Sequence, residues 1–228
     1  MKRNLFDILQ DHRRRRCPVA VVTDVASGDQ SLVTADGANG DLSISAEAQS
    51  LVLGLLTEDR SGFTQGYFVR SYCPPWTVIL IGAVHIAQAL VPIAKLSGFQ
   101  VRIIDPRQAF ASDSRFPDTP IDAEWPDQAL AETPPDAHSA VVTLTHDPKI
   151  DDPALIAASR SPAFFIGALG SRRNHERRVS RLIEAGATPD QVARISGPVG
   201  LDLGGRSAGE IAVSIVAEIV AARHGKSP

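Results

Sequence analysis

The chain has 228 residues, of which 43% are hydrophobic and 21% charged, and its formal net charge is −3. This length and composition are typical of a soluble protein that buries a core of its own, either as one α/β domain or as a core domain with a smaller lobe. The small negative charge argues against general nucleic-acid binding, which needs a basic surface to displace counterions.

Membrane and redox signals point to the cytoplasm. No apolar run approaches the ~20 residues that a membrane helix needs, and Asp7 and Asp11 interrupt any signal-peptide core near the N-terminus. The two cysteines, Cys17 and Cys73, are too few for a disulfide framework. We therefore expect a cytoplasmic protein with two reduced thiols and no membrane span.

The first third of the chain carries the weaker structural signals. Short apolar patterns predict helices at 1–16 and 46–56 and strands at 17–22 and 66–71. Residues 36–41 are dense in turn-forming residue types. We interpret residues 1–72 as a small N-terminal α+β lobe.

The middle of the chain has the pattern of a βαβ unit. The apolar run 76–81 predicts a strand that is buried on both faces. A glycine turn at Gly82, an apolar helix and a second strand over 99–104 follow it, and Asp105 ends that strand. We therefore predict that residues 73–228 form a Rossmann-like, doubly wound parallel sheet.

The remaining elements follow from the same kind of pattern. We expect strands at 140–144 and 163–166 and helices at 153–160, 172–186, 189–194 and from residue 207 onward. Pro153 is expected in the first turn of its helix, and Ser207 has capping-box spacing to Glu210. Residues 113–136 carry seven acids against a single base, Arg115, and are predicted to form a surface connection without a core element.

The glycine turn after the first strand of the βαβ unit is the first candidate site. In a dinucleotide site a second glycine lets the backbone approach the pyrophosphate, but here Val84 stands at that place. Asp105 has the spacing of a ribose ligand, and His85 lies outside the carboxyl end of a strand, where ligands bind in open α/β sheets. A nucleotide site and a scaffold without a nicotinamide cofactor both stay open.

A second candidate site follows the third strand, at His146 and Asp147. His85 also follows a strand, so both histidines are expected to face one crevice. Two histidines and an aspartate can ligate a metal or shuttle a proton. A solvated loop is the alternative.

The third candidate site is an anion site. Gly167 and Gly170 flank a turn, Ser171 is a good N-cap, and Arg172 and Arg173 occupy the first helical turn. Cations at this end oppose the helix dipole, which costs a few tenths to about 1 kcal/mol per charge without a ligand. The arrangement makes sense if an anion binds to the helix start and to arginine.

The same helix also places Arg173, Arg177 and Arg181 on one face. The alternative to an anion site is therefore a basic helix that pairs with the acidic segment 113–136 of the same chain.

A glycine-rich loop precedes the last helix and has four glycines in the nine positions 197–205. Such a loop permits close backbone approach to a ligand, and Gly200 and Asp202 are its candidate contacts. A purely structural reversal is the alternative.

Five ordered stretches over about residues 76–224 resemble the XdhC/CoxI family of molybdenum-hydroxylase maturation factors. They are LIGAVHIAQAL, VRIIDPRQAFASDSRFP, VTLTHDPKIDDPAL, FFIGALGSRRNHERR and RISGPVGLDLGGRSAGEIAVSIVAEI. The resemblance implies a Rossmann-like domain and a protein that binds molybdenum cofactor, as molybdopterin or its nucleotide form. It also implies help with sulfuration or metal loading of the cofactor, and its transfer to an apo xanthine dehydrogenase- or carbon monoxide dehydrogenase-type enzyme.

The cofactor is a pterin with a phosphate, so it is an anion suited to a helix start with arginines. Under this resemblance the expected cofactor-binding residues are Gly82, His85, Asp105, Arg107, Gly167, Gly170, Ser171, Arg172, Arg173, Gly200 and Asp202. His146 and Asp147 are expected to approach the metal.

Two departures from the family pattern affect the expected partners. Val84 stands where the family usually has glycine, and residues 26–29 lack the cysteine that the family's N-terminal lobe usually carries. The chain is thus a divergent or split version, or a separate family protein supplies the N-terminal function. A cysteine desulfurase is a further candidate partner, and a homodimer stays open.

We expect an accessory protein rather than an enzyme with its own turnover. Two other classes stay open: an NAD(P)-dependent oxidoreductase or other nucleotide-binding protein, and a catalytically silent structural partner of the apoenzyme.

Overall fold

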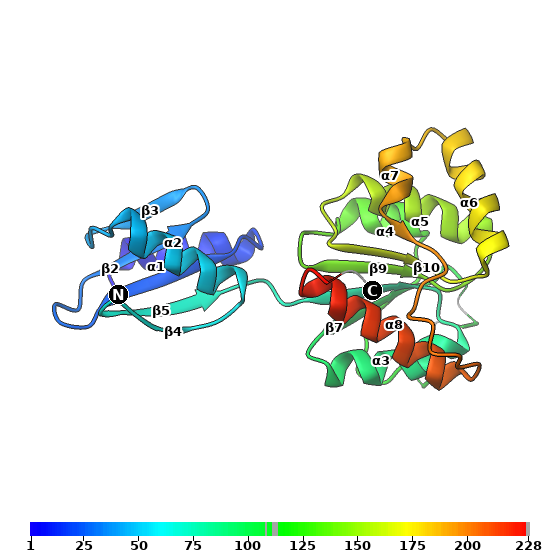
Figure 1. Cartoon of the computed structure of the whole chain (residues 1–228), viewed down its shortest axis with the longest axis horizontal. Coiled ribbons are helices and arrows are strands. Elements are labelled where there is room, and N and C mark those ends of the chain that lie inside the picture. Colours follow the sequence, from blue (N-terminus) through cyan, green and yellow to red (C-terminus); the bar gives the residue numbers. More distant parts are fainter. Residues whose placement is uncertain (108, 111–113, 227–228) are drawn as a thin grey trace. The chain divides into compact units, whose positions relative to one another are not determined.

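The computed structural model describes residues 1–107, 109–110 and 114–226, and the chain divides into two compact units, Met1–Pro74 and Pro75–Pro228 (Figure 1). Each unit has its own sheet. Among the described residues, no helix has both the length and the apolar character that crossing a bilayer requires.

The N-terminal unit is a five-stranded antiparallel sheet with the strand order β3-β2-β1-β5-β4. Its elements are α1 (Arg3–Arg14), β1 (Val19–Asp24), β2 (Gln30–Thr34), β3 (Gly37–Gly40), α2 (Ala46–Thr57), β4 (Gly62–Thr64) and β5 (Tyr67–Tyr72).

Alternation along the central strand places a helix on each face of this sheet. Val19 and Val21 pack with Leu5 and Leu9 of α1, whereas the alternate residues of β1 pack with α2. The predicted helices and strands of this unit are present, but three strands were not predicted. The expected turn at 36–41 is largely β3, a Gly-Ala-Asn-Gly strand that pairs with β2 and has almost no side-chain signal.

The C-terminal unit is a six-stranded sheet with the order β11-β10-β9-β6-β7-β8, and its strand pairs are parallel. Its strands are β6 (Thr77–Ile81), β7 (Gln100–Ile104), β8 (Ile121–Asp122), β9 (Ser139–Thr143), β10 (Phe165–Ala168) and β11 (Ile195–Ser196). Numbered along the chain within this unit, the order is 6-5-4-1-2-3, which is that of the Rossmann fold. The predicted fold class is confirmed.

Helices cover both faces of the parallel sheet. They are α3 (His85–Leu96), α4 (Pro126–Glu132), α5 (Pro148–Arg160), α6 (Arg172–Glu184), α7 (Pro189–Ala193) and α8 (Ala208–Arg223). The helices α3 and α8 lie on one face, and α4 to α7 lie on the other (Figure 1).

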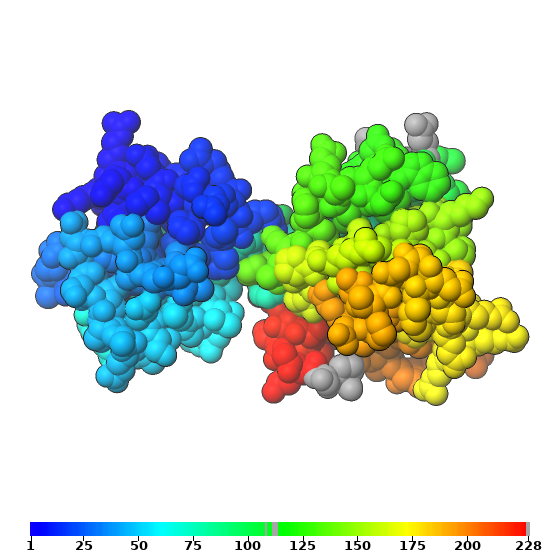
Figure 2. All heavy atoms as spheres, turned by 90° about the horizontal axis from the view of Figure 1, so that it is seen from above, coloured from blue at the N-terminus to red at the C-terminus, as the bar shows by residue number. Residues whose placement is uncertain are grey.

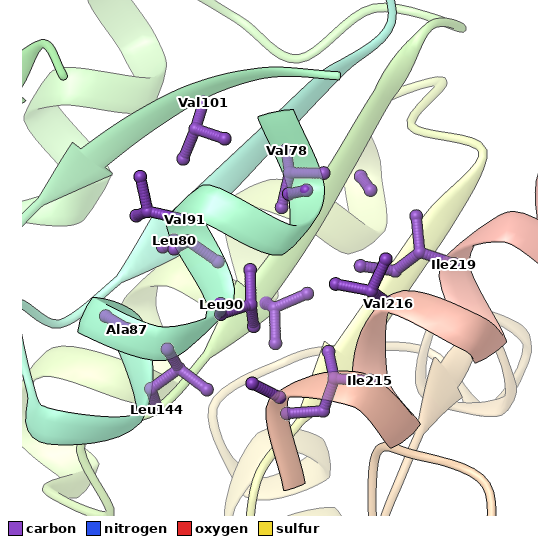
Figure 3. Close-up of a cluster of buried hydrophobic side chains, with 14 of the residues drawn as sticks. Val78, Leu80, Ala87, Leu90, Val91, Val101, Leu144, Ile215, Val216 and Ile219 are labelled. Carbon is purple, nitrogen blue, oxygen red and sulfur yellow. The ribbon is translucent and has the colours of Figure 1, made fainter. Parts of the chain in front are cut away.

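The core of this unit follows from the alternation in β6. Val78 and Leu80 point to the face covered by α3 and α8, where they meet Leu90 and Ile215 (Figure 3). Ile79 and the other alternate residues of β6 point to the opposite face and pack with α5. Burial on both faces explains the continuous apolar run that predicts this strand.

The prediction that residues 113–136 hold no core element is wrong. Asp113 lies outside the described residues, but Phe116 is buried, and β8 pairs with β7 at the sheet edge. Ala129 and Leu130 of α4 are also buried in the core beneath α5. The described acids of this segment lie on the outer side of short elements. The acid-rich composition therefore gives no sign that the other side of these elements is apolar and buried.

The predicted start of the α5 helix at Pro153 is also wrong. The helix begins at Pro148, and the Asp147 carboxylate accepts a hydrogen bond from the Lys149 N–H at 3.0 Å. Pro148 suits this first position because proline lacks an N–H group, so Pro153 lies inside the helix. The N-cap role of Ser171 and the capping box of Ser207 and Glu210 are confirmed.

Candidate functional site

The site lies at the carboxyl edge of the parallel sheet, between β6 and β9. These two strands are neighbours, with Ile81 opposite Thr143. The chain leaves β6 toward α3 on one face and leaves β9 toward α5 on the other. This is the point at which the strand order reverses, and ligands of open α/β sheets bind in the crevice there.

Gly82 brings the loops after these two strands into contact. Its φ is +113°, and any side chain at this position would collide with the Thr145 side chain. Its N–H group donates a 2.8 Å hydrogen bond to the Ile104 carbonyl. A glycine is therefore needed both for the backbone conformation and for the close approach of the loop after β9.

Asp105 is fully buried directly behind this turn. Its carboxylate accepts hydrogen bonds from the Ala83 N–H at 2.7 Å and from the Arg107 N–H, Nε and Nη2 at 3.0, 2.9 and 2.8 Å. Burial raises the pKa of Asp105, but the hydrogen bonds from Arg107 and Ala83 outweigh it and hold the pKa below its ordinary value. Both oxygens are engaged within the chain, and the residue fixes the turn.

Two arginines surround the same turn. The Arg107 guanidinium lies 4.5 Å from the centre of the Phe110 ring and is one-third exposed. Arg115 donates to the Ala83 carbonyl at 2.8 Å and to Gln88 Oε1 at 3.1 Å. Arg115 is noted in the sequence as the single base of an acid-rich segment but is not predicted as a site residue. Its isolation among acids was the signal that could have identified it.

The loop after β9 is organised by a buried acid, Asp151. It accepts hydrogen bonds from Thr145 Oγ1 at 2.7 Å and from the His146 N–H at 3.0 Å, and it is 1% exposed. Burial raises the pKa of Asp151, although these hydrogen bonds and Arg178 oppose the rise. His146 has a φ of +65°, a left-handed conformation that these bonds support.

The metal-binding prediction for His146 and Asp147 stays a prediction. Asp147 uses its carboxylate to cap α5. Within the part of the chain that the structure describes, no group of three or more His, Cys, Asp or Glu side chains is arranged to hold a metal ion. His85 is the exposed first residue of α3.

The start of α6 follows β10, the strand beside β9. Gly170 has a φ of +151°, and Ser171 Oγ accepts a 3.2 Å hydrogen bond from the Asn174 N–H. Arg172 and Arg173 are exposed, and their guanidinium groups form no ion pair with the described residues. Two uncompensated cations thus stand at an end of the helix that is already electropositive.

Arg178, one turn further along α6, is buried and incompletely paired. It is 4% exposed, and Nη2 donates to the Leu169 carbonyl at 2.9 Å. Nε and Nη1 are buried and have no hydrogen-bond partner among the described residues. Burial lowers the pKa of Arg178, and the charges of Asp151 and Asp152 oppose this only in part.

Two acids of α5 pair with the basic helix. Arg181 donates to both Asp152 oxygens, at 2.7 and 3.0 Å. Asp151 lies 3.9 Å from Arg178 Nη2. Asp122 of the segment 113–136 pairs with Arg102 of β7.

A cavity of about 190 Å³ opens between α5 and α6 beside the loop after β9. It is lined by His146, Pro148, Asn174, Arg177, Arg178 and Arg181. The residues of α6 and α7, yellow to orange, form an exposed surface of this unit in the space-filling view (Figure 2). Asn174 and Arg177 of this lining are exposed, so the cavity is cationic and reached from solvent.

The glycine-rich loop is anchored to neighbouring elements. The Gly200 N–H and Ser196 Oγ each donate to Glu218 of α8 at 2.5 Å. A side chain at Gly167 would collide with Val199, so this loop packs directly on β10. Asp202 is exposed beyond these contacts.

The predicted site residues thus fall into distinct environments. The turns at Gly82 and His146 are in contact at the switch point, and the start of α6 follows the adjacent strand. Gly167 supports the glycine-rich loop. Asp105 acts from behind the turn, because its oxygens are already engaged.

Known proteins are similar to most of this chain. Residues 78–219 match the family profile of the XdhC Rossmann domain. A protein of Escherichia coli K12 named molybdenum cofactor insertion chaperone PaoD is 32% identical over 177 residues, covering 78% of this chain and 49% of that protein. A protein of Bacillus subtilis 168 named as a probable xanthine dehydrogenase subunit is 34% identical over 162 residues, covering 70% and 47%.

This chain spans about half the length of these two curated relatives. A crystal structure described as a xanthine dehydrogenase from Bacillus halodurans superposes with a TM-score of 0.68 at 22% identity, covering 98% of this chain and 64% of that one. At this identity the similarity supports the fold alone.

Proposed function

The chain belongs to the XdhC family, and on that basis we propose that it is a maturation factor for a molybdenum hydroxylase. It binds molybdenum cofactor as cargo and assists its sulfuration, metal loading or insertion into a xanthine dehydrogenase- or carbon monoxide dehydrogenase-type apoenzyme. The name of the Escherichia coli relative, a cofactor insertion chaperone, supports this role.

The observation that carries the proposal is the uncompensated positive charge at the start of α6. Arg172 and Arg173 are exposed and unpaired among the described residues, next to the edge where Rossmann folds bind ligands. The buried Arg178 nitrogens without partners also fit an anionic guest. Molybdenum cofactor carries a phosphate, so this end of the helix suits it.

The other residues have supporting roles in this proposal. Gly170 and Ser171 shape the phosphate end, while Gly82 and His85 line the pterin side. Arg107 reaches the same side and is held in place by its pair with buried Asp105.

His146 and Asp147 approach the metal end of the cargo. Gly167 supports the loop that carries Gly200 and Asp202, and this loop covers the bound cofactor.

The environment of Cys73 favours a sulfur source other than this thiol. Burial raises the pKa of Cys73 to about 12, and nearby Asp59 adds to the rise. The thiolate is the reactive form, so this thiol is a poor sulfur carrier at neutral pH. We propose that a cysteine desulfurase, or a separate family protein with an N-terminal lobe, supplies the sulfur. We place the exchange in the cytoplasm.

The nucleotide-dependent alternative rests on Asp105 as a ribose ligand. Both oxygens of that carboxylate already accept hydrogen bonds from the chain, so the alternative loses the residue that motivated it. Calorimetric titration with NAD, which has a pyrophosphate but no phosphate monoester, should therefore give no binding heat.

The proposed function is tested by equilibrium binding of released molybdenum cofactor to the full chain, detected by pterin fluorescence after oxidation. We expect the Arg172→Ala/Arg173→Ala variant to bind at least about 10-fold more weakly, because the loss of even one hydrogen bond to a charged group costs ~1.5–3 kcal/mol and ~1.4 kcal/mol is a factor of ten. Arg160→Ala, on the exposed far end of α5, is the control. Equal affinity of wild type and the double variant would defeat the assignment.

A further inference from the structure

The cavity between α5 and α6 has an unbalanced set of charges. Three arginines line it, Arg177, Arg178 and Arg181, and no carboxylate is among its described lining residues. Asp152 neutralises Arg181 through two hydrogen bonds. Asp151 lies 3.9 Å from Arg178 Nη2 and offsets part of its charge, so Arg177 leaves the cavity with a net positive charge that suits an anion.

The buried Arg178 guanidinium is incompletely hydrogen-bonded among the described residues. Nε and Nη1 have no hydrogen-bond partner among the described residues, which is rare for buried donors. Asp151 does not fill this role, because it lies 3.9 Å away, beyond hydrogen-bond distance, and already accepts from Thr145 and His146. The guanidinium therefore keeps unused donors beside the cavity that it lines.

The first turn of α6 adds donors at the same place. Asn174 lines the cavity from the third position of the helix, where the dipole favours negative charge. Gly170 lies directly over Arg178, so a side-chain atom added there would be 3.8 Å from Nη2. The positive φ of Gly170 favours glycine. Because glycine has no side chain, the only atoms of residue 170 near the guanidinium are those of the backbone.

We infer that this cavity is a binding site for a phosphate group carried by a monoester. Arg178 offers the fixed fork that matches phosphate oxygens, and Arg177 and Asn174 contact it from the rim. About 190 Å³ is below the range of pockets that enclose whole drug-sized ligands, so the site takes the phosphate and leaves the rest of the molecule outside. The identity of the monoester, molybdenum cofactor, rests on the proposed function, whereas the phosphate site does not.

The site is tested with inorganic phosphate and glycerol phosphate as probes, titrated into the full wild-type chain by calorimetry and by phosphorus NMR. The variants are Arg177→Gln and Asn174→Asp, both at exposed positions, and Arg160→Gln is the matched control at the far end of α5. We expect one site per chain, at least tenfold weaker binding in both variants, and no change in the control. Glycerol phosphate should bind at least as tightly as inorganic phosphate.

Asn174→Asp separates binding from folding. An acid in the first helical turn favours the dipole, so its melting temperature should equal or exceed that of wild type while phosphate binding falls. No binding of either probe to wild type, or equal binding by wild type and both variants, would overturn the inference. Binding of inorganic phosphate without glycerol phosphate would overturn the monoester assignment.

The cofactor-binding assay keeps the two proposals distinguishable. If the variants lose phosphate but wild type does not bind molybdenum cofactor, the proposed function fails and the site stands. If wild type and both variants bind the cofactor equally, the cavity is not the cofactor's phosphate site and the proposed function survives.

Discussion

The guanidinium of Arg107 binds the carboxylate of Asp105 through both oxygens, at 2.9 and 2.8 Å, two residues apart in the chain. The same carboxylate holds the Ala83 N–H, so one buried acid joins the ends of β6 and β7. Asp105 lies at the end of β7, where a Rossmann fold has its ribose ligand. Its hydrogen bonds instead stabilise the turn after β6.

Asp105→Asn should therefore destabilise the C-terminal unit. The amide cannot accept from all of these donors, and leaving buried donors unsatisfied costs ~1–3 kcal/mol. Urea unfolding of the full chain measures the loss. Asp202→Asn, at an exposed position, is the control and should unfold as wild type does.

The pH dependence of stability should show the contribution of the ionised Asp105 carboxylate. The folded-state pKa of Asp105 is below its ordinary value, so its stabilising contribution is fully present above the unfolded value of ~3.9 and is lost as pH falls through the folded value. The stability difference between wild type and Asp105→Asn should thus shrink below about pH 4. A difference that stays constant down to pH 2 contradicts this interpretation.

Gly82→Ala should be strongly unfavourable. The positive φ and the collision with Thr145 both oppose a side chain, so we expect a loss above about 1 kcal/mol in unfolding free energy. Gly209→Ala in α8, where an added carbon has open space, should instead change stability by a few tenths to ~1 kcal/mol in the favourable direction. If both variants destabilise equally, the turn does not require glycine.

Arg173→Glu should weaken binding while it stabilises the fold. Reversing an exposed cation in the first turn of α6 removes an unfavourable dipole interaction, so without ligand the melting temperature should rise, corresponding to a few tenths to about 1 kcal/mol. Cofactor binding should fall at the same time. A variant that is less stable than wild type would show that the arginine serves the fold.

Cys73 should react slowly with thiol reagents. Its raised pKa of about 12 leaves almost no thiolate at pH 8, so labelling by iodoacetamide should be far slower than for a free cysteine. Cys73→Ser should leave cofactor transfer unchanged. Rapid modification of Cys73 in the folded chain, measured by mass spectrometry of its peptide, would contradict the assigned environment.

The sequence predicts best where a residue's environment is set by its neighbours in the chain. The run Thr77–Ile81 predicts a buried strand because both faces are covered, and Ser207 predicts a helix start because its cap partner is three residues away. The helix α4 escapes prediction because seven residues with outward acids show little periodicity.

Arg178 could not be found in this way. Regular spacing favours Arg173, Arg177 and Arg181 as one face, and Arg178 resembles one more surface charge. Its burial depends on Asp151 and on the chain at Leu169, which come from other elements. The position of Asp105 is predictable from the motif, but its engagement with Arg107 is set by three-dimensional geometry.

The pterin content of the full chain, isolated from its native host, shows directly whether the protein carries molybdenum cofactor. We predict bound pterin in wild type, its loss in Arg172→Ala/Arg173→Ala, and activation of an apo molybdenum hydroxylase by the loaded wild type only. A wild-type chain that carries no pterin and still activates the apoenzyme, or a double variant that carries as much as wild type, would contradict it.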